Sequence, residues 1–274
     1  MPKKVDIQKE NLINGPDFDK WDKWIEEIHP GEPVSEDEIL KYEKKLVAFL
    51  DLLGITKEIR SKVNGTENEI ISKMSKIKDI VEIEINAAPM NEKMTMLYIS
   101  DTFIFVCEQE ALVSFLQMLS SIQMRILVEC KTLLRGALEY GDVIVQDGGK
   151  QIIGPAYIDA YMKQEHDAIF PRIIIGNSVL DIINTKIKDY DKVVISQDRE
   201  YSLDYIDVYM TLEHKSKNET RIRLRREGVF SYLCDEYIKY NKENNSSVRA
   251  KYAWTINYLK EKGVWSIAKQ HNCW

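Results

Sequence analysis

The sequence predicts an α+β fold: a ferredoxin-like βαββαβ sheet followed by extra C-terminal strands and helices. Short apolar runs of strand length alternate with longer helical stretches, in the order strand, helix, strand, strand, helix, strand. Only Asp101 and Thr102 separate the second and third runs, so a tight hairpin joins them. Hydrophobic residues make up 44% and charged residues 30% of the 274, which is typical of a globular protein. We therefore expect helices to cover one face of this sheet.

The elements can be assigned in order along the chain. For the core we expect a strand at 46–50, a helix around 56–80 broken near Asn64-Gly65, strands at 94–100 and 103–107, a helix at 109–130 and a strand at 132–145. Beyond the core we expect a helix near 155–168, a strand at 172–175, a helix near 178–188, a strand at 192–196 and a mostly helical C-terminal third. The last helix would be capped by Ser246-Ser247 and end at Gly263. This order predicts an N-terminal extension at 1–43, a sheet domain at 44–212 and a helical C-terminal extension at 213–274.

Charge and apolar pattern exclude several classes of protein. The formal net charge is −6, whereas a nucleic-acid-binding surface is usually basic, so we expect no nucleic-acid partner. No stretch approaches the ~18 uncharged apolar residues of a membrane span, and the N-terminus lacks the apolar core of a signal peptide. The four cysteines have no CxxC pairing and are expected to be reduced thiols. These features predict a cytoplasmic protein without membrane contact.

Two aspartates stand where a metal ion is expected. Asp51 ends the first apolar run, where a carboxylate is costly unless it is paired or binds a cation. Asp101 lies at the hairpin tip, and the first and third strands of a ferredoxin-like sheet are neighbours, so the two carboxylates should meet. A divalent ion removes their repulsion, and two hard oxygen ligands suit Mg²⁺ or Mn²⁺. The backbone amides of Leu52-Leu53-Gly54 can cradle phosphates at the strand-to-helix turn. The alternative is that Asp51 caps a helix and Asp101 is an ordinary turn residue.

Four short segments between residues 44 and 165 carry motifs in a recognisable order. Phe49–Gly54 resembles F-x-D-x-x-G, Ile99–Asp101 resembles I-G-D with Ser for Gly, Arg135–Gly141 resembles R-x-G-x-x-x-G with its first Gly shifted, and Ile153–Ala160 resembles the helix start W-G-x-x-V-N-x-A. As a set, they resemble the class III nucleotidyl cyclases, the family of adenylyl and guanylyl cyclases.

This resemblance implies a pyrophosphate-releasing nucleotide cyclase with a palm-type sheet, acting on a nucleoside triphosphate. It also implies a head-to-tail homodimer with composite active sites between the subunits. Asp51 and Asp101 would hold two Mn²⁺ or Mg²⁺ ions per site, with the Leu52 carbonyl as an extra ligand, and Arg135 or Lys163 would contact the triphosphate. The implied nucleotide contacts are Phe49, Leu52, Leu53, Gly54, Leu97, Tyr98, Gln151 and Tyr157.

The residues that would read the base depart from those of the purine cyclases. Leu97 stands where purine cyclases keep a Lys or Glu, and Gln151 stands where they keep an Asp or Cys. A cyclase without purine-reading residues resembles the pyrimidine cyclases of the Pycsar antiphage systems. This resemblance implies UTP or CTP as substrate, with cyclic UMP or cyclic CMP as a second messenger of antiviral defence.

A second departure concerns the transition state. Ile158 and Met162 occupy the positions of the family's helix Asn and Arg, so Lys163 or Arg172 would have to substitute. Three alternatives stay open: a purine cyclase, a catalytically inactive cyclase-like module that binds a nucleotide, and a polymerase-like palm. The net charge of −6 disfavours the palm, which needs basic template grooves.

Overall fold

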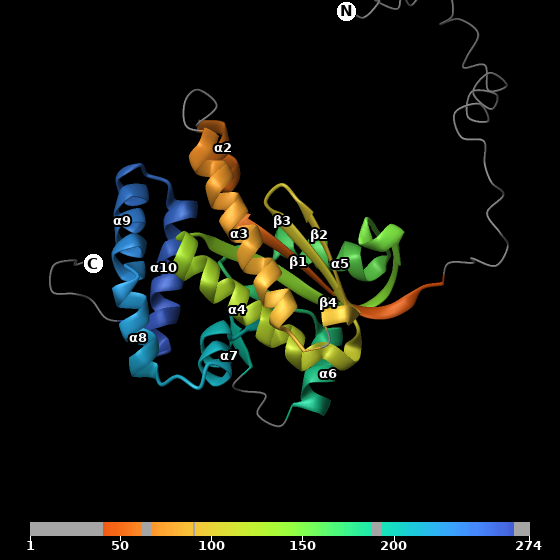
Figure 1. Ribbon diagram of the computed structural model, residues 1–274. Coiled ribbons are helices and arrows are strands. Elements are labelled where there is room, and N and C mark those ends of the chain that lie inside the picture. Colours follow the sequence, from red (N-terminus) through yellow and green to blue (C-terminus); the bar gives the residue numbers. More distant parts are fainter. Residues whose placement is uncertain (1–40, 62–66, 90, 188–192, 266–274) are drawn as a thin grey trace, which may run out of the picture. The chain divides into compact units, whose positions relative to one another are not determined.

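The computed structural model describes residues 41–61, 67–89, 91–187 and 193–265 (Figure 1). The N-terminal extension expected at 1–43 therefore lies almost wholly outside the described residues. From Tyr42 onward the chain belongs to one compact unit, which includes the sheet and the C-terminal helices. The domain boundary at residue 212 stays a prediction.

The first half of this unit is the expected βαββαβ core. Its elements are β1 (Glu43–Leu53), α2 (Ile55–Ser61), α3 (Glu67–Ala87), β2 (Met94–Ile99), β3 (Thr102–Cys107), α4 (Leu112–Cys130) and β4 (Leu133–Gln146). The strands lie in the order β2-β3-β1-β4, with every neighbour antiparallel. This is the ferredoxin-like order, so the predicted fold class is confirmed. The break expected near Asn64-Gly65 falls between α2 and α3, in residues outside the described part of the chain.

Alternate residues of β1 contribute to two different cores, because successive side chains of a strand point to opposite faces. Leu46, Ala48, Leu50 and Leu52 lie in the main hydrophobic core with α3 and α4. Val47 and Phe49 face the other side, where α5 (Pro155–His166) packs on the sheet. The expectation of helices on one face only is therefore wrong. The small side chains of Ala156 and Ala160, both buried, let α5 approach the second face closely.

Three further strands extend the sheet beyond β4. A fourth strand pairs with the C-terminal end of β4 itself. β6 (Ile173–Ile175) runs parallel to β4 and is followed by α6 (Asn177–Lys186), β7 (Val194–Gln197) and β8 (Glu200–Leu203), in the sheet order β4-β6-β8-β7. β5 (Gln151–Ile153) pairs with the end of β4. The sequence pattern misses β5 and β8, because strands of three and four residues show no clear alternation. Gly154 follows β5 with a φ of +154°, and a Cβ atom there would lie 2.5 Å from the Asp142 carbonyl oxygen.

Four C-terminal helices pack together against the end of α4: α7 (Tyr205–Leu212), α8 (Lys217–Arg226), α9 (Val229–Lys242) and α10 (Ser246–Glu261) (Figure 1). They enclose a second buried cluster, to which α4 contributes Met124, Leu127 and Val128. The cap of α10 is Asn245, whose side chain accepts from the Val248 backbone N–H at 3.2 Å, and the expected Ser246-Ser247 cap is wrong.

A buried polar cluster ties the start of α7 to α10. Asp204 is fully buried and accepts a hydrogen bond from the Tyr258 hydroxyl at 2.8 Å. It also caps α7 by accepting from the Asp207 backbone N–H at 3.3 Å. Lys262 forms ion pairs with Asp204 and, at 2.9 Å, with Asp207. Each buried polar group therefore has a partner, and the cluster fixes how the last helix docks.

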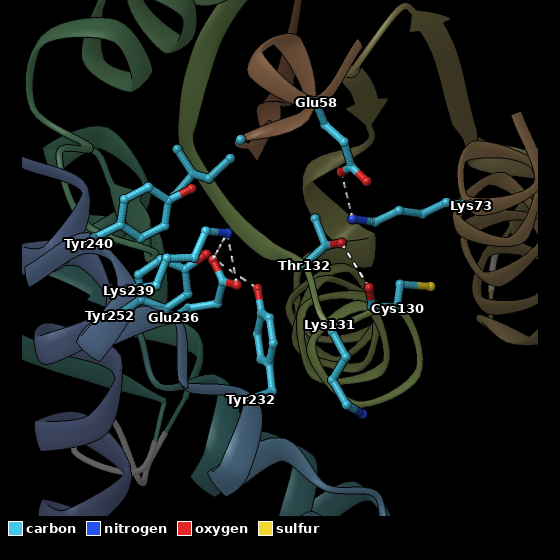
Figure 2. A pocket seen from close by; sticks show the side chains of 12 residues that line it. Glu58, Lys73, Cys130, Lys131, Thr132, Tyr232, Glu236, Lys239, Tyr240 and Tyr252 are labelled. Atoms are coloured by element: carbon cyan, nitrogen blue, oxygen red, sulfur yellow. Dashed lines mark hydrogen bonds and ion pairs between the residues drawn. The ribbon is translucent and has the colours of Figure 1, made fainter. Parts of the chain in front are cut away.

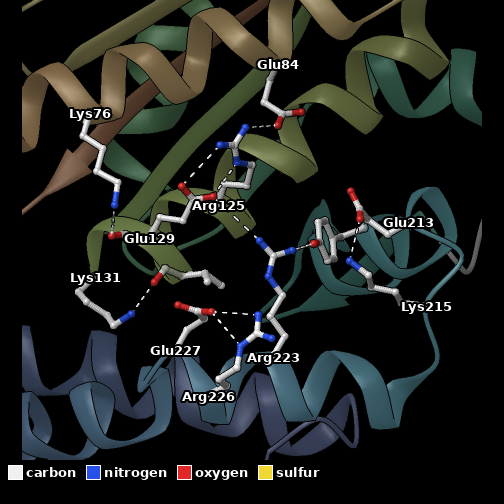
Figure 3. Close-up of polar contacts among 12 residues, drawn as sticks. Lys76, Glu84, Arg125, Glu129, Lys131, Glu213, Lys215, Arg223, Arg226 and Glu227 are labelled. Atoms are coloured by element: carbon white, nitrogen blue, oxygen red, sulfur yellow. Dashed lines mark hydrogen bonds and ion pairs between the residues drawn. The ribbon is translucent and has the colours of Figure 1, made fainter.

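A second set of polar contacts joins α8 to the core helices (Figure 3). Arg125 of α4 pairs with Glu84 of α3 and with Glu129, each at 2.8 Å. Arg223 of α8 reaches the same Glu129 at 4.0 Å and donates to the Tyr209 hydroxyl. Glu129, which is itself on α4, thus connects to α8 through Arg223, and Arg125 extends this network to α3.

One helix among the described residues is long and apolar enough to cross a membrane. Residues Gln109–Cys130 have the length and composition of a membrane span, but 78% of the apolar window is buried inside the protein. Cys107 and Cys130 are free. Cys234 is held in a disulfide, so the expectation of four reduced thiols is wrong at this residue.

Candidate active site

The end of β1 and the β2–β3 hairpin bring Asp51 and Asp101 together. Asp51 pairs with Thr102 in the register of β1 and β3, and the Leu52 backbone N–H donates to the Asp101 carbonyl at 3.1 Å. Ser100 has a φ of +58°, a left-handed conformation that favours the glycine found in the related motif. The two aspartates are therefore neighbours, as the hairpin prediction requires.

Each carboxylate has one oxygen engaged and one without a hydrogen-bond partner among the described residues. Arg135 lies opposite Asp51 in the register of β1 and β4, and its Nε donates to Asp51 Oδ2 at 2.9 Å. The Thr56 hydroxyl donates to Asp101 Oδ2 at 3.0 Å. Burial raises the pKa of Asp51, the bond from Arg135 lowers it, and the charge of Asp101 raises it again, with a net upward shift. Asp51 thus lacks enough positive charge nearby to offset its burial.

This pair of carboxylates fits a divalent cation. The two Oδ1 atoms are hard oxygen ligands, and Mg²⁺ and Mn²⁺ fill their remaining positions with water and substrate phosphate. No group of three or more His, Cys, Asp or Glu side chains forms a fuller cage within the described part of the chain. Leu52 can supply only its backbone carbonyl as the extra ligand, because a leucine side chain has no oxygen, nitrogen or sulfur atom.

The Arg135 guanidinium is held by α5 as well as by Asp51. Its Nη1 lies 3.5 Å from the Gln164 carbonyl and 3.4 Å from the Ala168 carbonyl, and its Nη2 lies 3.4 Å from Glu165. The side-chain oxygen of Gln164 is placed to accept from Nε and Nη2 at 3.0 Å. Sequence reasoning found Arg135 from its motif but missed Gln164. The sequence carries no signal for Gln164, because its burial, with only 2% of the residue exposed, is known only from the structure.

Lys163, next to Gln164 on α5, points to a different group. Its Nζ lies 3.6 Å from Glu139 and 3.8 Å from Asp167. Burial raises the pKa of Glu139, while Lys163 and the Ser178 hydroxyl act in the opposite direction. Within one chain Lys163 therefore neutralises Glu139, and its contact with a triphosphate stays a prediction.

Three of the expected nucleotide contacts share the α5 face of the sheet. Phe49, Leu97 and Tyr157 belong to one apolar cluster, with the Phe49 and Tyr157 rings 6.0 Å apart. Tyr98 follows Leu97 on β2 and points to the opposite face, where its ring stacks on Phe103 at 4.6 Å. The structure does not bring Tyr98 to the other three residues.

Gln151 lies at the other end of the sheet from Asp51. It pairs with Gln146 at the end of β4, eleven residues along the strand from Arg135. The turn at Asp147–Gly149 packs against β2, since a Cβ atom on Gly149 would lie 2.2 Å from Thr95 Cγ2. Gln151, two residues after Gly149, therefore lies near β2.

A cavity of about 510 Å³ opens beyond the end of β1, lined there by Leu53 and Gly54 (Figure 2). Its other walls come from α2, α3, the turn after α4, α9 and α10. Two ion pairs lie in these walls, Lys73 with Glu58 at 3.0 Å and Lys239 with Glu236 at 3.1 Å. The Tyr232 and Tyr252 hydroxyls are 3.3 Å apart. Gly54, which has a φ of +89° and follows Asp51 by three residues, thus lines this cavity.

Solved structures similar to this chain include cyclase domains. A class III adenylyl cyclase-like ATP-binding protein from Pseudomonas aeruginosa aligns with a TM-score of 0.48 and 13% identity, over 71% of this chain and 48% of that one. A bacterial light-regulated adenylyl cyclase gives 0.45 and 13%, over 64% and 57%. The monomeric guanylyl cyclase domain of the RhoGC fusion protein from the aquatic fungus Blastocladiella emersonii gives 0.44 and 18%, over 60% and 96%.

This chain thus spans about half the length of the first two of these proteins. No protein-family model matches the sequence. No curated protein matches it either. The chemistry of the site has to be argued from the chain's own residues.

Proposed function

We propose that this chain is a class III-type nucleotidyl cyclase that converts UTP or CTP to the 3′,5′-cyclic monophosphate and pyrophosphate. The observation that carries the proposal is the pair Asp51 and Asp101, beside the Arg135 guanidinium 2.9 Å from Asp51. Each carboxylate has one oxygen without a hydrogen-bond partner among the described residues. The two carboxylates can bind divalent metal ions, and the neighbouring guanidinium can bind phosphate. This combination suits phosphoryl transfer from a nucleoside triphosphate.

In this reaction the ribose 3′-oxygen bonds to the α-phosphorus while the bond from that phosphorus to the β-phosphate bridging oxygen breaks. The hydroxyl proton passes to water, and pyrophosphate leaves. Asp51, Asp101 and the Leu52 carbonyl would hold two Mn²⁺ or Mg²⁺ ions, which supply Lewis acidity at the attacking and leaving oxygens. Arg135 forms an ion pair with Asp51 in the protein described here. In the substrate complex its planar guanidinium binds the triphosphate.

Gln151 pairs with Gln146, eleven residues along β4 from Arg135, and this position away from the two aspartates supports active sites shared between two subunits. Ile153, Ile158 and Met162 expose large apolar side chains near α5, a surface that a second copy would bury. A head-to-tail homodimer would set the aspartates of one chain against Gln151 and Lys163 of the other.

The base preference follows from Leu97 and Gln151. Leu97 is half-buried in the apolar cluster and offers no hydrogen bond, so a purine edge there would lose about 1–3 kcal/mol per unpaired polar group. Gln151 is exposed and carries both a donor and an acceptor, which suits uracil or cytosine. The pyrimidine cyclic nucleotide would then act as a cytoplasmic second messenger of antiviral defence, the role that the resemblance to the Pycsar cyclases implies.

The direct test is to incubate the full chain with Mn²⁺ and each of the four ribonucleoside triphosphates, then identify the products by mass. We expect cyclic UMP or cyclic CMP well above cyclic AMP and cyclic GMP. A purine cyclic nucleotide as main product would refute the pyrimidine assignment and leave the cyclase chemistry standing. Nucleotide binding without any cyclic product would instead indicate an inactive cyclase-like module.

A further inference from the structure

The last helix, α10, lies against the end of the sheet that carries the two aspartates. Tyr252 lines the cavity that Leu53 and Gly54 border at the end of β1. Two residues further along α10, Trp254 stacks on Phe170 with ring centroids 6.0 Å apart and planes at 10°. Phe170 precedes β6, the strand next to β4. The chain between Tyr252 and Trp254 is therefore fixed at the edge where β1, β4 and β6 meet.

Lys251 is the cationic residue that α10 presents there. It is half-buried, and among the described residues its ammonium has no ion pair and no hydrogen bond. Burial lowers the pKa of Lys251 and the charge of Arg135 lowers it further, whereas Asp51 and Glu165 raise it. Lys251 therefore lies within electrostatic range of all three groups that surround the candidate site.

Within the part of the chain that the structure describes, the Lys251 ammonium has no counter-ion of its own. Asp51 and Glu165 both already pair with Arg135, at 2.9 and 3.4 Å. A half-buried charge without a partner is unfavourable, so this position favours an anionic ligand. Two divalent cations on Asp51 and Asp101 would make the surroundings more positive still, which suits a polyanion.

We propose that Lys251 binds the triphosphate of the nucleotide held by Asp51 and Asp101 of its own chain. This inference rests on the proposed function and deepens it. Met162, at the position of the family's transition-state arginine, supplies no charge, and Lys163 is engaged by Glu139 at 3.6 Å. Lys251 adds a second cation beside Arg135 and comes from a helix outside the βαββαβ core. Its contact with the leaving phosphates stabilises the charge that develops on pyrophosphate.

The test uses inorganic tripolyphosphate with Mn²⁺ as a probe, so that it does not depend on turnover. In titration calorimetry on the full chain, Lys251→Met should weaken binding by about tenfold or more, the size expected for loss of one charge-assisted contact. Lys251→Arg should retain most of the binding. Lys242→Met, at an exposed lysine near the end of α9, is the matched control and should bind as the unmodified protein does.

A labelling experiment on the unmodified protein covers the case in which Lys251→Met does not fold. Acetylation of Lys251, followed by mass spectrometry, should slow when Mn²⁺ and tripolyphosphate are present, while that of Lys242 should not change. Equal labelling of Lys251 with and without the probe would overturn the inference, and so would unchanged binding by a folded Lys251→Met protein. Binding through Lys251 without cyclic product from any triphosphate would leave this contact standing and refute the proposed reaction.

Discussion

Replacing Asp51 by asparagine keeps the shape of the side chain and removes the charge that would hold a cation. Arg135 keeps Glu165 at 3.4 Å and the Ala168 carbonyl at 3.4 Å, so its guanidinium is not left without partners. We expect cyclic product to fall at least about a hundredfold, as a loss of about 3 kcal/mol of transition-state stabilisation implies. Product formed per second at saturating triphosphate and Mn²⁺, measured by mass spectrometry, gives this ratio.

The same variant has a signature in stability. Because the folded pKa of Asp51 lies above its ordinary value of 3.8, the ionised carboxylate costs stability once the pH rises through the folded pKa. Asp51→Asn should therefore gain stability relative to the unmodified protein as the pH rises from about 4 toward neutrality. With Mn²⁺ at a hundred times its Kd, the unmodified protein should gain about 2.7 kcal/mol, or about 5–10 °C in Tm.

Asp51→Asn should show little of that Mn²⁺-dependent gain. The matched control is Asp142→Asn, an exposed carboxylate on β4, which should keep both the activity and the Mn²⁺ gain. A folded Asp51→Asn protein with near-normal turnover, or with the full gain in Tm from Mn²⁺, would refute the reasoning.

Three further perturbations test assembly, base reading and the C-terminal docking. If the active sites are shared between subunits, mixing Asp51→Asn chains with Lys163→Ala chains should restore activity, because each heterodimer has one intact site. An active monomer in sedimentation would argue against shared sites. Gln151→Ala should raise KM for the preferred pyrimidine about tenfold, while an unchanged KM would remove Gln151 from the base. Asp204→Ala removes the buried partner of the Lys262 ammonium and should lower the free energy of unfolding by about 3–5 kcal/mol. Denaturant titration checks this, and an unchanged unfolding midpoint would contradict it.

The core was predictable because its signals are local. The apolar runs and the two-residue gap before Phe103 define the strands, and ferredoxin-like order then places Asp51 beside Asp101. The Ser100 conformation and the Arg135 bond add detail that the motifs only imply.

The groups that were missed lie on helices whose positions depend on packing over long sequence distances. Gln164 meets Arg135 only because α5 crosses the second face of the sheet, which the sequence reading left uncovered. Lys251 lies within range of Asp51 only because the C-terminal helices close on the end of α4. Tyr98 was expected at the nucleotide together with Leu97, although strand alternation turns the two side chains to opposite faces of the sheet.

The docking of α10 at the end of β1 has a consequence for how the protein is made. Leu53 and Tyr252 line the same cavity but lie about two hundred residues apart in the chain. At about 5–20 residues per second, the ribosome completes that wall roughly 10–40 s after it has produced β1. During this interval the nascent chain has the strand that carries Asp51 but not the helix that borders it. Translation itself therefore delays the completed site, and a chain cut short before residue 245 would have the sheet without this wall.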